Sequence, residues 1–319
     1  MKTQKLAIIG LGHVGTSVLA TAVQTELFGE IVLLDSKKEK AMGEALDQIH
    51  ANGFLSRRNI KIYAGDYKDL SDADVIIIAA TYVYADGNIP ADRQALLKDN
   101  LTIIQEIMEN IIKNTQTAML IFITNPADTI IYLASQYDYP RHLMLSTGTM
   151  LDSARLRQIL GQYYQVDPKA ISGIMMGEHG YTAFPVLSHL TIGGIAYADL
   201  ASYFPEKPLL SAEKITEQVV QSAYDVFDAK SGVTDAAVAQ AALDLAACIL
   251  LDEKAIYPVS IAMTQDSYGL SLDCAYSVPC VLGRNGVEKA LFLSLNDWEQ
   301  TKLAKSVASI QTSIALAKE

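Results

Sequence analysis

Residues 5–15 are KLAIIGLGHVG, a short apolar segment that runs into three glycines spaced as GxGxxG. This order predicts a buried strand, a tight turn and the first turn of a helix. Gly10 would permit the turn, Gly12 would let backbone amides approach a pyrophosphate at the helix N-terminus, and Gly15 would permit close packing of the helix on the sheet. The spacing alone is weak evidence for a dinucleotide-binding loop because glycine turns are common. The elements on either side must therefore be considered.

An acidic residue follows at the distance that this pattern requires. Asp35 ends the next apolar segment, 20 residues after Gly15. A carboxylate there can bind the ribose 2′-hydroxyl of NAD and repel the 2′-phosphate of NADP. The structural alternative is a glycine turn followed by an aspartate that caps a helix. Because strand, turn, helix and acid come in the expected order, we favour a dinucleotide site that takes NAD.

Short apolar segments alternate with helical segments over the first half of the chain. The segments rich in Val and Ile that we expect to form strands are 5–10, 31–35, 60–64, 74–80, 118–124 and 143–147. The helices expected between them are 15–28, 37–51, 92–113 and 127–136. Apolar character on both faces is typical of buried parallel strands, and alternation with helices indicates βαβ units. Residues 1–147 are therefore predicted to form a Rossmann domain with a doubly wound parallel sheet.

The second half, residues 148–319, lacks this alternation. The segments expected to form strands are 171–176, 185–192, 256–264, 276–282 and 287–293. The expected helices are 209–230, 233–251 and 296–317, the last with Asn296 or Asp297 as its N-cap. Clustered strands and helices predict an α+β domain. No linker is obvious, so we expect the two domains to pack tightly.

Composition excludes several classes of protein. The 319 residues are 50% hydrophobic and 19% charged, which is typical of a globular chain. A net charge of −11 disfavours nucleic-acid and anionic-membrane partners. Neither a membrane-spanning segment nor a secretory signal is visible, so we expect a cytoplasmic protein. The 3 cysteines are odd in number and lack ligand spacing, which indicates reduced thiols and no metal site.

Polar residues stand out in three later segments. Asn125 follows an apolar segment, at the strand end where doubly wound sheets bind ligands. Asp152 and Arg155 share a helix face because they are three residues apart, and His179 stands in the glycine-flanked GEHG. A histidine beside a carboxylate suggests an acid–base pair, and an arginine beside both suggests capture of a substrate carboxylate. From the residues alone, a helix cap, a surface ion pair and a structural histidine stay open as alternatives.

The chain resembles the NAD-dependent L-lactate/malate dehydrogenase family from end to end. The matching stretches are GLGHVG, GEALDQIH, GDYKDLSDADVIII, ITNPAD, GTMLDSARLR, GEHG, LSHLTIGG and SVPCVLGRNGV. Several are long and specific, although the family's tryptophan before Ser188 is Leu187 here. The resemblance implies reversible hydride transfer between NADH and a 2-oxo acid, which yields an L-2-hydroxy acid. Its implied partners are these small acids, and neither nucleic acid nor a membrane.

The resemblance also implies a role for each site residue. Protonated His179 gives its proton to the ketone oxygen as the hydride arrives, and Asp152 orients His179 and stabilises its imidazolium. Arg155 binds the substrate carboxylate through both arms of its guanidinium. Asn125 positions the ketone and the nicotinamide. Arg93 closes over the substrate, polarises the carbonyl and helps to exclude water, or else is an exposed arginine at a helix start.

Departures from the family pattern bear on which acid is used. Thr234 matches a threonine that lines the substrate side-chain pocket. Residues 81–92, TYVYADGNIPAD, contain no Arg or Lys to pair the second carboxylate of malate. This loop is also longer and more apolar than the lactate pattern, and Tyr181 replaces the usual Asp or Asn. These features resemble the L-2-hydroxyisocaproate branch, so we expect a 2-oxo acid with an apolar side chain.

Two alternative functions remain open at this point. L-lactate dehydrogenase is the near alternative, and an NAD-binding sensor or structural protein without catalysis is the distant one. The resemblance implies a homo-oligomer, with a tetramer favoured. It also bears on activation by fructose bisphosphate, which in many bacterial members needs an Arg–His pair. Arg157 matches that arginine but Ser172 stands at the histidine position, so we expect no such activation.

Overall fold

The computed structural model of the chain describes residues 3–82, 97–230, 232–266 and 268–318. The strands of its first half are β1 (Lys5–Ile9), β2 (Glu30–Leu34), β3 (Lys61–Ala64), β4 (Val75–Ile78), β5 (Met119–Phe122) and β6 (Met144–Ser146). They lie in the order β3-β2-β1-β4-β5-β6, and every neighbouring pair is parallel. This order confirms the predicted Rossmann sheet.

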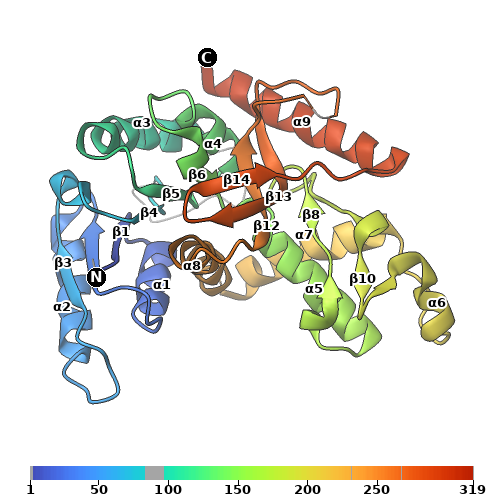
Figure 1. The fold of residues 1–319 in the computed structure, drawn as a ribbon, viewed down its shortest axis with the longest axis horizontal. Coiled ribbons are helices and arrows are strands. Elements are labelled where there is room, and N and C mark those ends of the chain that lie inside the picture. The colour runs from blue at the N-terminus through green and yellow to red at the C-terminus, as the bar shows by residue number, and fades with distance from the viewer. Residues whose placement is uncertain (1–2, 83–96, 231, 267, 319) are drawn as a thin grey trace.

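Helices cover both faces of this sheet (Figure 1). Those of the first half are α1 (His13–Ala22), α2 (Lys38–Ala51), α3 (Leu97–Asn114) and α4 (Ala127–Ala134). Because right-handed crossovers run in opposite directions from β1 and from β4, α1 and α2 lie on one face and α3 and α4 on the other. Strands β1, β4 and β5 are buried along their whole length, which explains why their segments are apolar on both sides.

The second half adds three further strands to the same sheet. They are β12 (Ile256–Ala262), β13 (Ala275–Gly283) and β14 (Gly286–Ala290). Strand β12 pairs antiparallel with β6 through Ser260 and Ser146, which gives a sheet of nine strands that runs through both halves. The expected division into domains at residue 147 therefore falls within one continuous sheet, and the boundary stays a prediction.

The remaining helices of the second half surround this extension. They are α5 (Met150–Tyr164), α6 (Leu200–Tyr203), α7 (Ala212–Lys230), α8 (Ala236–Leu251) and α9 (Asp297–Lys318). Helix α8 packs against α1, and α9 packs against α3 and α4. Asn296 caps α9: its Oδ1 accepts a hydrogen bond from the Glu299 amide, and Glu299 Oε2 accepts one from the Asn296 amide, both at 3.0 Å. Of the two expected caps, Asn296 is therefore the one that forms.

The strands expected at 171–176 and 185–192 are wrong in length. The structure has only β7 (Ile171–Ser172), β8 (Met175–Met176), β9 (Phe184–Pro185), β10 (Thr191–Ile192) and β11 (Ile195–Ala196), in two small sheets. Gly173 interrupts the first segment, and Pro185 has no backbone donor with which to continue the second. Short 3₁₀ helices complete the described chain: η1 (Tyr67–Leu70), η3 (Arg141–Leu143), η4 (Pro168–Ala170), η5 (Leu187–His189) and η6 (Tyr197–Asp199).

Two properties of the described residues bear on function. None of their helices is long and apolar enough to cross a membrane. They also contain no cluster of three or more His, Cys, Asp or Glu side chains that could hold a metal ion. Cys248, Cys274 and Cys280 are buried and unoxidised.

Candidate active site

The glycine loop has the geometry that its spacing predicts. Gly10 has a φ of +90°, and a Cβ there would lie 2.5 Å from the Ala80 backbone. A Cβ on Gly15 would lie 1.9 Å from the Gly10 carbonyl oxygen, so α1 approaches the loop as only glycine permits. At Gly12, by contrast, a Cβ would meet nothing within 4 Å. Gly12 lines the main cavity, so this open space is available to a bound group.

Asp35 ties the end of β2 to the glycine loop. Its Oδ2 accepts a hydrogen bond from the Leu11 amide at 2.7 Å, and its Oδ1 accepts one from the Lys37 amide at 2.9 Å. Asp35 is not the N-cap of α2, because that position is Lys37 and has no side-chain cap hydrogen bond. A carboxylate has acceptor sites beyond these two bonds, so ribose hydroxyl groups can still be bound.

One cavity of about 560 Å³ runs from the glycine loop to the second half of the chain. His13, Thr16 and Lys40 line it on the side of the glycine loop. The predicted site residues that line it are Gly12, Asn125, Asp152, Arg155, His179 and Thr234. Its size is in the range of small-molecule sites, and it brings the expected cofactor and substrate residues together.

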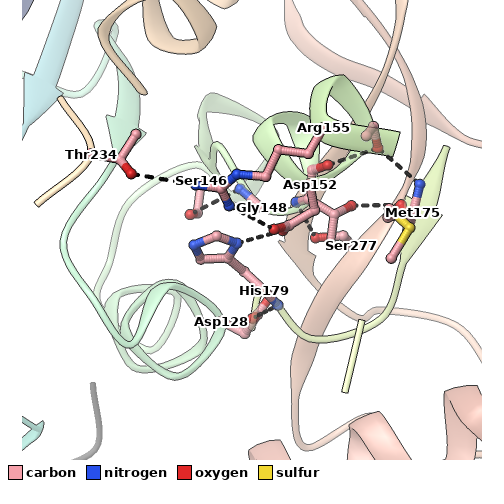
Figure 2. A network of polar contacts seen from close by, with 11 residues as sticks. Asp128, Ser146, Gly148, Asp152, Arg155, Met175, His179, Thr234 and Ser277 are labelled. Carbon is pink, nitrogen blue, oxygen red and sulfur yellow. Dashed lines mark hydrogen bonds and ion pairs between the residues drawn. The ribbon is translucent and has the colours of Figure 1, made fainter. Parts of the chain in front are cut away.

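His179 and Asp152 form the central pair of this cavity (Figure 2). Asp152 Oδ2 lies 2.6 Å from His179 Nδ1, and the side chains are only 6% and 13% exposed. The carboxylate therefore holds Nδ1, which leaves Nε2 as the nitrogen that can exchange a proton with a substrate. The structure therefore brings the histidine and the carboxylate into contact, and their acid–base role stays a prediction.

Arg155 links this pair to Thr234. Its Nη1 lies 3.3 Å from Asp152 Oδ1, and its Nη2 lies 3.4 Å from the Thr234 hydroxyl oxygen. Figure 2 shows the guanidinium reaching from α5 across Asp152 toward Thr234, which precedes α8. Because the arginine is only 11% exposed, its charge is poorly solvated and suited to binding an anion.

The start of α5 is held by a buried network of hydrogen bonds. The Thr149 hydroxyl donates to the Met175 carbonyl at 2.7 Å, and the Thr149 amide donates to the Ser277 hydroxyl at 3.0 Å. The Ser153 hydroxyl accepts from the Met175 amide at 2.8 Å and donates to the Thr149 carbonyl at 2.7 Å. These bonds join α5 to β8 and β13, so they fix the helix that carries Asp152 and Arg155.

Asn125 follows β5 and faces the cofactor side of the cavity. Its backbone oxygen accepts a hydrogen bond from Asn100 Nδ2 at 2.7 Å. Its side-chain Oδ1 is buried and has no hydrogen-bond partner among the described residues. A buried acceptor of this kind favours a ligand that brings an N–H group. The nicotinamide carboxamide offers one, so Asn125, Gly12 and Asp35 together fit NAD.

Arg93 lies outside the described residues, as does most of the loop at 81–92. Its role in closure over the substrate stays a prediction. Asn100, which lies on α3, is fully buried. Its Oδ1 accepts a hydrogen bond from the Tyr82 amide at 2.7 Å, so Asn100 connects the start of the loop to Asn125.

Two groups of residues at the site could not be identified from the sequence. The first is an apolar wall from α7 and α8, which consists of Val220, Ala223, Phe227, Val238 and Ala241. Its only sequence sign is the helical spacing of apolar residues, which is equally typical of an ordinary core. The second is Asp128, which lies within the quoted ITNPAD stretch and contacts the backbone of His179. A buried aspartate cannot be told from an exposed one by sequence spacing.

Known proteins match the chain over its whole length. Residues 4–142 match the family model of the lactate/malate dehydrogenase NAD binding domain, and residues 149–319 match that of the alpha/beta C-terminal domain. An L-lactate dehydrogenase of Selenomonas ruminantium is 39% identical over 312 residues, which are 98% of this chain and 97% of that protein.

Solved structures agree with these matches. A lactate dehydrogenase, MGS-M5, from a Medee basin deep-sea metagenome library superimposes with a TM-score of 0.92 at 30% identity and full coverage of both chains. The lactate dehydrogenase of Cryptosporidium parvum, solved with lactic acid and NAD, superimposes with a TM-score of 0.90 at 29% identity, over 100% of this chain and 99% of that one. The chain therefore belongs to the NAD-dependent lactate/malate dehydrogenase family, whose members are oxidoreductases that act on a CH–OH group.

Proposed function

We propose that this 2-hydroxy acid dehydrogenase is an L-lactate dehydrogenase, which interconverts pyruvate and L-lactate. The observation that carries the proposal is the cavity in which His179, Asp152, Arg155 and Thr234 converge beside the glycine loop. Two relatives that match 98% and 97% of this chain are named L-lactate dehydrogenases. This choice replaces the hydroxyisocaproate preference expected from the sequence.

In this proposal, bound NADH supplies the hydride that reaches C2 of the 2-oxo acid. Protonated His179 donates a proton from Nε2 to the ketone oxygen, so an alcohol forms. Asp152 holds Nδ1 and stabilises the imidazolium before the transfer. In the reverse reaction neutral His179 accepts the hydroxyl proton. The charge of the imidazole therefore changes in each turnover, while Asp152 remains ionised.

Arg155 binds the substrate carboxylate in this scheme. Its guanidinium offers several N–H donors in a planar fork, of which Nη1 contacts Asp152 and Nη2 contacts Thr234. Asn125 would help to hold the cofactor, since its buried Oδ1 could accept a hydrogen bond from the nicotinamide carboxamide. The role that the resemblance gives to Arg93, closure over the substrate and exclusion of water, is part of the proposal, although Arg93 lies outside the described residues.

Two observations favour a second candidate, which is an L-2-hydroxy acid dehydrogenase for larger apolar acids. The wall formed by Val220, Ala223 and Phe227 on α7 is apolar, and residues 81–92 lack a cation that could bind a second carboxylate. Such a wall accommodates a methyl group or a branched side chain. Steady-state kcat/KM with NADH distinguishes the candidates. We expect pyruvate to exceed 2-oxo-4-methylpentanoate at least tenfold, and the reverse order would support the second candidate.

The proposal includes a homo-oligomer in the cytoplasm. Met42, Leu46 and Ile49 follow helical spacing along α2, and they are 55%, 51% and 42% exposed. Phe54 and Leu55 extend this exposed apolar face just beyond the helix. Burial of such a face against a second copy gains free energy from the hydrophobic effect. Light scattering of the wild type and of Leu46→Lys measures the number of subunits and tests this face.

A further inference from the structure

Asp128 is a buried carboxyl group at the site for which the proposed mechanism has no use. It lies in the first turn of α4 and is only 3% exposed. Its Oδ2 accepts a hydrogen bond from the backbone amide of His179 at 2.7 Å, as Figure 2 shows. Burial of a carboxyl group costs free energy. A contact with the main chain of the proposed acid–base residue suggests why this position carries one.

Asp128 is also close in sequence to Asn125. Only Pro126 and Ala127 separate them, so one short segment at the end of β5 carries both side chains. Asn125 lines the cofactor side of the cavity, and Asp128 binds the chain that carries His179. A shift of His179 relative to Asn125 therefore requires this segment to deform or the hydrogen bond to break.

The loop that carries His179 needs such an anchor. Gly177 and Gly180 flank the Glu178–His179 pair with φ values of +87° and +140°. Asp152 binds the imidazole at Nδ1, and Asp128 binds the backbone amide of the same residue. Asp128 thus fixes the backbone amide of His179, and Asp152 fixes its imidazole ring.

We infer that Asp128 is a positioning residue that sets the His179 imidazole relative to Asn125 through the main chain of His179. The inference rests on the proposed acid–base role of His179. Small misplacements of reacting groups lower rates strongly, by as much as about 10²-fold for a shift near 1 Å. Loss of this anchor should therefore slow the chemical step more than it weakens binding.

The acceptor role does not require a charge on Asp128. The ionised side chains of Asp152 and Glu178 oppose ionisation of Asp128, and the buried thiol of Cys274 and the Ser260 hydroxyl are further neighbours. Burial is the main reason that the pKa of Asp128 rises to about 7. The oxygen of a neutral carboxyl group, or of an amide, can still accept from the His179 amide. Asparagine at position 128 should therefore preserve the hydrogen bond to the His179 amide, whereas alanine should abolish it.

The experiment compares Asp128→Ala and Asp128→Asn in the full-length enzyme, with pyruvate and NADH. We expect Asp128→Ala to lower kcat at least about tenfold, with NADH affinity by fluorescence within about twofold of the wild type. The primary isotope effect with 4-deuterated NADH should rise because hydride transfer becomes rate-limiting. Asp128→Asn should restore kcat to within about threefold of the wild type. Ser260→Ala, which removes a neighbour of Asp128 and leaves the His179 contact, is the matched control and should keep wild-type kcat.

Two outcomes would overturn the inference. One is wild-type kcat in Asp128→Ala, and the other is an equal loss of kcat in Asp128→Ala and Asp128→Asn. If Asp128→Ala does not bind NADH, Asp128→Ser replaces it, since its hydroxyl is too short to reach the His179 amide. His179→Asn separates the two proposals. Full activity in His179→Asn refutes the acid–base role itself, whereas an inactive His179→Asn with a fully active Asp128→Ala refutes only the anchor.

Discussion

The hydroxyl groups of Tyr181 and Tyr224 are hydrogen-bonded to each other at the outer end of the substrate cavity. Their ring centroids are 6.0 Å apart. Tyr181 comes two residues after His179, and Tyr224 lies on α7. Both residues line the main cavity and also a second hollow of about 330 Å³ beyond it. Together with Val220, the pair borders both spaces, and we expect it to act as a partition between them.

Removal of this partition should change substrate preference. Tyr224→Ala would join the two spaces and make room for a longer side chain, so kcat/KM for 2-oxo-4-methylpentanoate relative to pyruvate should rise at least tenfold. A few buried methylene groups at about 0.8 kcal/mol each account for a change of that size. Tyr203→Ala on α6 is the control, since Tyr203 is 63% exposed and does not line either space. An unchanged ratio in Tyr224→Ala would show that the partition does not limit substrate size.

Arg155→Lys should weaken substrate binding although the charge is kept. A lysine ammonium cannot present two parallel donors to a carboxylate. Loss of one charge-assisted hydrogen bond costs about 1.5–3 kcal/mol, so KM for pyruvate should rise about ten- to a hundredfold. Arg157→Lys, two residues further along α5, serves as the control because Arg157 does not line the cavity and its Nη1 donates to the Gly173 carbonyl at 3.3 Å. Equal KM values for the two variants would argue against Arg155 as the carboxylate ligand.

Asp152→Asn should slow the reaction. The variant loses the negative charge that lies 2.6 Å from His179 Nδ1 and stabilises the imidazolium, and reduction of the 2-oxo acid needs that imidazolium. We therefore expect kcat with pyruvate and NADH to fall at least about a hundredfold. Steady-state rates of the wild type and the variant measure the effect, and an unchanged kcat would contradict the assigned pairing.

The raised pKa of Asp128 makes the stability of the folded protein depend on pH. Between the ordinary range of an aspartate and pH 7, the unfolded chain has lost this proton while the folded protein retains it. The unfolded state then binds fewer protons, so this group lowers the free energy of unfolding as pH rises toward about 7. Asp128→Asn lacks that dependence. The Tm of Asp128→Asn minus that of the wild type, as measured by calorimetry, should increase as pH rises from about 5 to about 8. A constant difference in Tm over that range would refute the prediction.

Much of the first half could be predicted because its determinants are local. The GxGxxG loop and Asp35 follow from the spacing of residues within one βαβ unit, and alternation of apolar segments with helices leaves few arrangements of the sheet. The segments expected to form strands in residues 1–147 all lie in the parallel sheet. For the site, the residue types in ITNPAD, GTMLDSARLR and GEHG indicated the chemistry, and the resemblance indicated the roles.

Other features depend on contacts between residues far apart in the chain. Asp152 and His179 meet across 27 positions, Tyr181 and Tyr224 across 43, and Asp128 and His179 across 51. The pairing of β12 with β6, which extends the sheet into the second half, rests on the single partner pair Ser146 and Ser260. Local spacing limits the backbone, so the nucleotide-binding unit and the residue types of the site could be inferred from the order of residues alone. The anchor of His179 and the wall of the substrate cavity could not, because burial and distance depend on how whole elements pack.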